Sequence, residues 1–312
     1  MESLKLSIES IVPIFILMAL GYVIRERKLA DKGNFDVMNK LVFNIFLPTL
    51  LFYNIYKIGD IKTFDFKLAG FLAAGTFLVF FAGYFAVKLI TKDNTKRGVM
   101  LQGFFRSNYA ILGVPVVEYI CRGNSTGLAS LMVAVVIPVF NVLAVISLER
   151  FRGGRVDIKG MIKGIITNPL IIGSLIGVIF MLFNITLPTV IEKAVSDVSK
   201  IASPLAIIIL GASFSFSSIS GYVKELTTVV LVRLIIVPLV AVMGAVMLGF
   251  RGEALACLLI AFGAPVAVSS FAMTQQMGGD ENLSAQIIVV TSALCLVTLF
   301  GWIFILNYMG FF

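Results

Sequence analysis

Long apolar runs separated by short charged clusters recur along the whole chain. A helix needs about 20 apolar residues to cross the hydrocarbon core of a bilayer, and about 17 to 25 is the usual range. Reading between the charged clusters predicts about ten such segments, at residues 8–24, 36–56, 68–87, 98–120, 125–149, 163–183, 198–219, 222–248, 253–277 and 283–309. The pattern therefore predicts an all-α polytopic membrane protein with about ten transmembrane helices.

The apolar segments form two sets of five that match when the chain is shifted by about 155 residues. Pro48 then falls beside Pro204. A unit of five helices crosses the membrane an odd number of times, so two such units must enter it from opposite sides. Inverted repeats of this kind are typical of secondary transporters, whose substrate lies near the midplane. We expect one repeat at residues 1–150, a second at 164–312, and a short basic cytoplasmic linker at 151–163 between them.

The fourth and ninth segments carry helix-breaking residues at matching depths. The fourth contains NYAILGVP at 108–115, and the ninth contains GAPVAVSS at 263–270. Proline cannot donate the hydrogen bond of a helix interior and glycine tolerates non-helical backbone, so both segments are expected to break. Backbone freed at the midplane requires surrounding protein or a polar cavity. Half-helix N-termini at a break attract anions, whereas freed carbonyls could instead hold a cation.

These two segments supply the candidate substrate-binding residues. The polar and helix-breaking candidates are Asn108, Tyr109, Gly113, Pro115, Gly263, Pro265, Ser269 and Ser270, together with Arg106. Three amides are further candidates for contact with substrate or ion: Gln275, Gln276 and Asn141. A different interpretation also fits, because proline kinks occur without a binding site and isolated amides form hydrogen bonds between membrane helices.

Two charges interrupt the interior of the predicted segments, Arg106 and Arg233. A charge inside lipid is costly, so each should face protein, a water-filled path or a headgroup. In the functional interpretation they attract an anionic substrate. Glu118 and Glu149 lie near segment ends, and no Asp or Glu lies deep in a segment. A carboxylate proton relay is therefore not expected, and either a bound ion such as sodium or the membrane potential drives transport.

Composition agrees with this picture. Hydrophobic residues make up 59% of the 312 positions and charged residues 13%, whereas soluble proteins average about 25% charged residues. The net charge of +8 comes from clusters between apolar runs, so it does not indicate nucleic-acid binding. The loops after the odd-numbered segments hold the larger share of Lys and Arg, which places them in the cytoplasm and both termini outside it.

Residue types that support catalysis or metal binding are scarce. The chain has no histidine, which excludes His-ligated metals and His general bases. The cysteines Cys121, Cys257 and Cys295 fall in separate apolar segments, so they are expected to be packing residues. Without deep carboxylates or a nucleophile–base pair, an enzyme is not expected. No cofactor is expected, and a sodium ion is an alternative that the sequence leaves open.

Five stretches of the chain carry a family likeness: NYAILGVP, NPLIIGSLIG at 168–177, LGASFSF, RLIIVPL at 233–239 and APVAVSSFAMTQQMGGD. They resemble the auxin efflux carrier family, which includes plant PIN exporters and bacterial organic-acid permeases such as those for malonate. The likeness covers essentially the whole chain, and the last stretch is the most specific. It implies the fold of the bile acid:sodium symporters, which has ten helices in two inverted five-helix repeats with crossed broken helices 4 and 9.

The resemblance also implies an elevator mechanism and a homodimer. Helices 1, 2, 6 and 7 would form the scaffold, and the crossing would frame a site for a carboxylate. The chain lacks the long hydrophilic central loop of many plant PIN proteins, so auxin is not the expected substrate. We therefore expect a plasma-membrane carrier that exports a small organic anion. A sodium-coupled importer of the same substrates is the main alternative, and a channel or membrane receptor is an alternative of another class.

Overall fold

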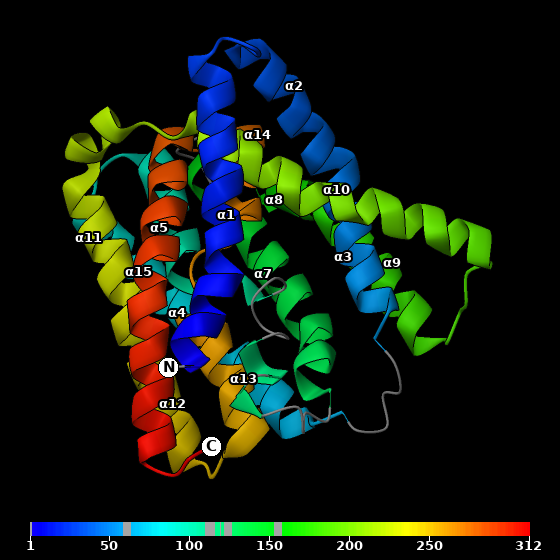
Figure 1. Ribbon diagram of the computed structural model, residues 1–312, viewed down its shortest axis with the longest axis vertical. Coiled ribbons are helices and arrows are strands. Elements are labelled where there is room, and N and C mark those ends of the chain that lie inside the picture. The colour runs from blue at the N-terminus through cyan, green and yellow to red at the C-terminus, as the bar shows by residue number, and fades with distance from the viewer. Residues whose placement is uncertain (1, 59–63, 110–115, 119, 122–126, 153–157) are drawn as a thin grey trace.

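The computed structural model describes residues 2–58, 64–109, 116–118, 120–121, 127–152 and 158–312 (Figure 1). The helices of the first half are α1 (Glu2–Glu26), α2 (Lys32–Leu41), the π-helical turn η1 (Val42–Phe46), α3 (Leu47–Tyr56), α4 (Phe66–Ile90), α5 (Asn94–Phe105) and α7 (Leu128–Arg152). Those of the second half are α8 (Ile158–Ile166), α9 (Pro169–Leu182), α10 (Thr189–Ser213), η3 (Phe216–Tyr222), α11 (Val223–Leu231), the π-helical turn η4 (Val232–Ile236), α12 (Val237–Met247), α13 (Gly252–Gly263), α14 (Ser269–Gln276) and α15 (Glu281–Tyr308). Within these ranges the only β pairing is an isolated bridge between Ser107 and Val266.

Six helical segments among the described residues are long and apolar enough to cross a membrane. They are Lys32–Tyr56, Phe66–Ile90, Leu128–Arg152, Thr189–Ser213, Ile219–Met247 and Glu281–Tyr308. Two shorter apolar helices accompany them, α9 and α13. The prediction of an all-helical, polytopic membrane protein is confirmed. Of the expected linker at 151–163, residues 151–152 end α7 and 158–163 belong to α8, while 153–157 lie outside the described residues.

Two helical segments of the first half match segments of the second half in length. The segments Lys32–Tyr56 and Thr189–Ser213 each have 25 residues, and residue 189 follows residue 32 by 157 positions. Helices α5 and α13 each have 12 residues, and residue 252 follows residue 94 by 158 positions. The spacing is thus slightly longer than the shift of about 155 expected from the sequence, and it aligns Asn108 with Val266 rather than with Gly263.

Two pairs of helices pack through glycine, which lets backbones approach closely in a membrane. In the pair α1 and α10, a Cβ on Gly211 would overlap the backbone of Met18, and one on Gly21 would overlap the carbonyl of Ile208. In the pair α3 and α9, a Cβ on Gly173 would lie 2.5 Å from the carbonyl oxygen of Pro48. Helix α10 also packs on α3. These four helices therefore form one closely packed group.

The remaining helices surround α5 and α13, which are each followed by extended backbone. Helix α5 packs on α7 and α4, and α13 packs on α12 and α7. Helix α4 and the α11–α12 segment run antiparallel and are tied at both ends by lysines. Lys67 Nζ donates to the carbonyl of Leu248 at 2.8 Å, and Lys224 Nζ donates to the carbonyl of Ile90 at 2.6 Å. Each lysine thereby caps the C-terminus of the opposite helix, where a cation is favourable.

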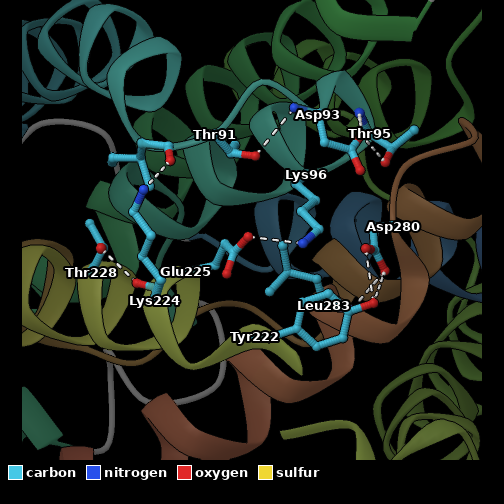
Figure 2. A network of polar contacts seen from close by, with 11 residues as sticks. Thr91, Asp93, Thr95, Lys96, Tyr222, Lys224, Glu225, Thr228, Asp280 and Leu283 are labelled. Atoms are coloured by element: carbon cyan, nitrogen blue, oxygen red, sulfur yellow. Dashed lines mark hydrogen bonds and ion pairs between the residues drawn. The ribbon is translucent and has the colours of Figure 1, made fainter. Parts of the chain in front are cut away.

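A polar network fixes the N-terminal end of α5 (Figure 2). Lys96 Nζ lies 2.9 Å from Glu225 Oε1 at the start of α11. Nearby, Tyr222 donates its hydroxyl to the carboxylate of Asp280, 3.0 Å from Oδ2, in the loop before α15. The network joins the start of α5 to α11 and α15. It thereby also fixes the position of the C-terminal end of α5, where the helix breaks.

Candidate functional site

The two interrupted helices meet where each one breaks. The chain is extended directly after α5 and after α13. In the extended stretches, the amide of Asn108 donates to the carbonyl of Pro265 at 2.8 Å, and the amide of Ala267 donates to the carbonyl of Arg106 at 3.3 Å. Each stretch therefore satisfies backbone groups that the other one leaves free, as non-helical backbone inside a membrane requires. This crossing is the candidate site.

Arg106 is buried at the crossing and has only neutral partners among the described residues. Its Nη2 donates to Asn141 Oδ1 at 2.8 Å and to Ser269 Oγ at 3.1 Å. Its Nη1 donates to Gln102 Oε1 and contacts Met273 Sδ, each at 3.1 Å. A buried cation that no carboxylate neutralises projects its charge into its surroundings. The arrangement is suited to binding an anion.

Only three charged side chains are buried among the residues that the structure describes: Arg106, Arg233 and Glu225. Glu225 is paired with Lys96 in the network of Figure 2. The two arginines lie at the crossing, where burial of an unpaired charge is costly unless polar groups solvate it. The charge of the site is thus set by two guanidinium groups.

Arg233 binds backbone rather than side chains. It lies in the π-helical turn η4, a type of helix irregularity often found at functional sites. Its guanidinium donates to four carbonyls: Ala264 at 2.8 Å, Ala261 at 3.0 Å, and Phe104 and Phe105 at 3.2 Å each. These carbonyls belong to the C-terminal ends of α5 and α13. The structure therefore brings Arg233 to both broken helices at once.

The other predicted residues divide between the site and its supports. Ser269 is the first residue of α14 and binds Arg106. The hydroxyl of Ser270 is buried and has no hydrogen-bond partner among the described residues. The Tyr109 hydroxyl donates to the carbonyl of Ala129 at 3.2 Å, so it anchors the chain to α7. Gly263 ends α13 where the sequence predicted a break.

Two predicted groups lie elsewhere. Gly113 and Pro115 lie outside the described residues. Gln275 belongs to a contact between α14 and α2, where it accepts a hydrogen bond from Asn39 and donates to Asp36 Oδ1 at 2.9 Å. Gln276, its half-buried neighbour, also lies at the end of α14 away from the crossing. The structure does not bring these two amides together with Arg106.

Sequence reasoning missed three polar residues of the site. Ser107, like Ser270, has a buried hydroxyl to which no described residue forms a hydrogen bond. Gln102 lies one helical turn before Arg106, and this spacing is a signal that could have identified it. Ser174 on α9 accepts a hydrogen bond from Asn141 Nδ2 at 3.3 Å. It connects the site to the group formed by α1, α3, α9 and α10.

The described residues contain no group of three His, Cys, Asp or Glu placed to hold a metal ion. The oxygen atoms at the crossing are hydroxyls, amides and carbonyls. The carbonyls that face Arg233 are already bound by a cation, because its guanidinium donates to all four. The geometry therefore favours an anion next to Arg106.

Comparison with known proteins agrees with this architecture. A family model described as "Membrane transport protein" matches residues 6–158 and 155–303. An uncharacterized transporter of Methanothermobacter thermautotrophicus is 25% identical over 299 residues, which are 95% of this chain and 97% of that protein. The uncharacterized transporter MJ1031 of Methanocaldococcus jannaschii is 24% identical over 93% of this chain and 96% of its own length. The uncharacterized transporter YfdV of Escherichia coli K12 is 20% identical over 96% of this chain and 97% of its own length.

The matches cover nearly the whole chain, and the family is one of transporters rather than enzymes. They agree with the resemblance carried by the stretches around the two broken helices. The chain belongs to the membrane transport protein family, the family of the auxin efflux carriers.

Proposed function

We propose that this protein is a secondary carrier for a small organic anion and that Arg106 binds the carboxylate of the substrate. The observation that carries the proposal is the buried Arg106 guanidinium, whose partners among the described residues are all neutral. Helix α14 begins at Ser269 beside it, and a helix N-terminus adds a positive partial charge. The hydroxyls of Ser107 and Ser270, which no other described side chain or carbonyl binds, are available to the same ligand.

We further propose that the carrier has ten transmembrane helices in two inverted repeats and works as an elevator. The equal lengths of α5 and α13 and the reciprocal caps of Lys67 and Lys224 support the repeat. The closely packed group of α1, α3, α9 and α10 corresponds to the scaffold, together with α2, which is continuous with α3 in the segment Lys32–Tyr56. Helices α4, α5, α7 and α11–α15 correspond to the moving domain. The crossing belongs to the moving part, and Asn141 contacts the scaffold through Ser174.

Direction follows from the sign of the cargo. An inside-negative potential favours the exit of an anion by about 2.3 kcal/mol per charge per 100 mV. Uncoupled transport therefore runs outward, in line with export across the plasma membrane by a homodimer whose termini lie outside. A sodium-coupled importer is the second candidate, because the hydroxyls of Ser107 and Ser270, unbonded within the described ranges, are suitable sodium ligands.

Flux in proteoliposomes tests the proposal. Purified protein is reconstituted in liposomes loaded with radiolabelled acetate, malonate or succinate, and efflux is followed under an imposed inside-negative potential, with and without sodium. Efflux of at least one anion should exceed that from liposomes with the Arg106→Gln variant. Uptake that requires sodium would favour the importer. Equal efflux from both proteins would contradict the role of Arg106.

A further inference from the structure

The crossing combines the C-terminal ends of two helices. Each helix carries a partial charge of about −0.5 at its C-terminus, because its last carbonyls have no partner within the helix. Helices α5 and α13 both end at the crossing. Left alone, the two ends would supply about one negative charge. Such a site would attract a cation and repel a carboxylate.

Arg233 supplies one positive charge to these two ends. Its side chain is completely buried, and it donates to two carbonyls of each helix end. Within the described part of the chain the structure pairs no carboxylate with it. The unit charge of the guanidinium therefore balances the two helix C-termini.

We propose that Arg233 determines the charge specificity of the carrier. By neutralising the ends of α5 and α13, it leaves Arg106 as the unbalanced charge that the substrate meets. Arg233 itself does not contact the substrate and acts through the field of the two helix ends. The inference rests on the proposed function only in taking the substrate to be an anion.

The proposal separates the roles of the two arginines. Removal of Arg106 takes away the anion-binding group but leaves the helix ends neutral, so it should not create a cation site. Removal of Arg233 uncovers four carbonyls, which are good sodium ligands, and their negative potential cancels the attraction of Arg106. Arg233→Lys keeps one positive charge at the same place and serves as the matched control.

The experiment measures the thermal unfolding of purified wild-type protein, Arg106→Gln, Arg233→Gln and Arg233→Lys. Choline malonate is the anionic probe and sodium chloride the cationic one, each compared with choline chloride. We expect malonate to stabilise the wild type and Arg233→Lys but neither glutamine variant. We expect sodium to raise the Tm of Arg233→Gln alone. An Arg233→Gln protein with the wild-type malonate shift, or Arg106→Gln stabilised by sodium, would overturn the proposal.

If Arg233→Gln does not fold, the other two variants still decide the question. Arg233→Lys must keep at least half of the malonate shift, and Arg106→Gln must show no sodium shift. A folded Arg233→Lys protein without any malonate shift would show that the shape of the guanidinium matters rather than its charge. If malonate does not stabilise even the wild type, malonate fails as a substrate, yet the response of Arg233→Gln to sodium still tests the role of Arg233.

Discussion

Arg106 Nη2 donates a 2.8 Å hydrogen bond to Asn141 Oδ1, and this bond joins the broken helix to α7. Asn141 then donates to Ser174 on α9 at 3.3 Å. A single amide therefore connects the buried cation to the group of helices that we propose as the scaffold. The neutrality of this amide leaves the charge of Arg106 available to a ligand.

Asn141→Asp should strongly weaken carboxylate binding while the protein stays folded. The change keeps the shape of the side chain but places a carboxylate beside Arg106, and a buried ion pair with hydrogen bonds neutralises the guanidinium. We expect affinity for the anion to fall at least tenfold, measured by titration in detergent. Ser174→Ala is the control, because it removes the other contact of Asn141 without changing charge and should keep most of the affinity. Unchanged affinity in Asn141→Asp would argue against Arg106 as the anchor.

Ser107→Ala and Ser270→Ala should weaken ligand binding without weakening the fold. Both hydroxyls are buried and have no partner within the described part of the chain, and removing an unsatisfied polar group costs little or stabilises the protein. Each substitution should reduce affinity a few-fold and leave the Tm of the free protein unchanged. Ser147→Ala serves as the control, because the Ser147 hydroxyl donates to the carbonyl of Ala144 away from the site. This substitution should lower the Tm of the free protein and leave the ligand affinity unchanged. A lower Tm in Ser107→Ala with intact affinity would show that its hydroxyl only supports the fold.

Gly211→Ala should strongly destabilise the protein. A Cβ there would overlap the backbone of Met18, so α1 and α10 must separate, at a cost of about 1–3 kcal/mol. Gly301→Ala is the matched control within α15, because, apart from its own helix backbone and chain neighbours, no atom of the described residues lies within 4 Å of its Cβ position. It should be neutral or stabilise by up to about 1 kcal/mol, since alanine has the better helix propensity. Thermal unfolding of both variants checks the prediction, and equal Tm values would contradict the close packing of α1 on α10.

Cross-linking α2 to α14 should stop transport if the moving domain, which contains α14, slides against the scaffold, which contains α2. Asn39 donates a hydrogen bond to Gln275 across this contact. With Cys121, Cys257 and Cys295 replaced by alanine, cysteines at positions 39 and 275 can be joined by a short bifunctional thiol reagent. Flux should fall to background after cross-linking, whereas each single-cysteine protein treated with the same reagent should remain active. Full activity of the cross-linked protein would rule out movement between α2 and α14.

Much of the helical pattern can be predicted from the sequence, because charged clusters mark where each apolar segment must end. The break after Gly263 was also predictable from local sequence, because this glycine is followed two residues later by Pro265. The break in the first half begins at Arg106, well before Gly113 and Pro115. It depends on pairing between Asn108 and Pro265, which are far apart in the sequence, so local helix-breaking residues could not locate it.

The proximity of some candidate residues could be predicted, while their role as a binding site stays a prediction. Arg106, Ser269 and Asn141 come together as candidates drawn from three different helices, because a buried arginine requires polar partners. The role of Arg233 was not predictable, since its partners are main-chain carbonyls that have no signature in the sequence. Gln275 was a candidate for contact with substrate or ion, but it lies in a contact between helices away from Arg106. Its partner Asn39 lies on α2, and only the packing of α14 against that helix reveals the contact.

The most direct test of the central claim is ligand-induced stabilisation of the wild type and of Arg106→Gln in sodium-free choline buffer. A ligand at 100 times its Kd stabilises the folded state by about 2.7 kcal/mol, which is readily seen as a rise in Tm. We predict that at least one small carboxylate raises the Tm of the wild type, that Arg106→Lys keeps part of the rise, and that folded Arg106→Gln shows none. An equal rise in the wild type and in Arg106→Gln would contradict the account.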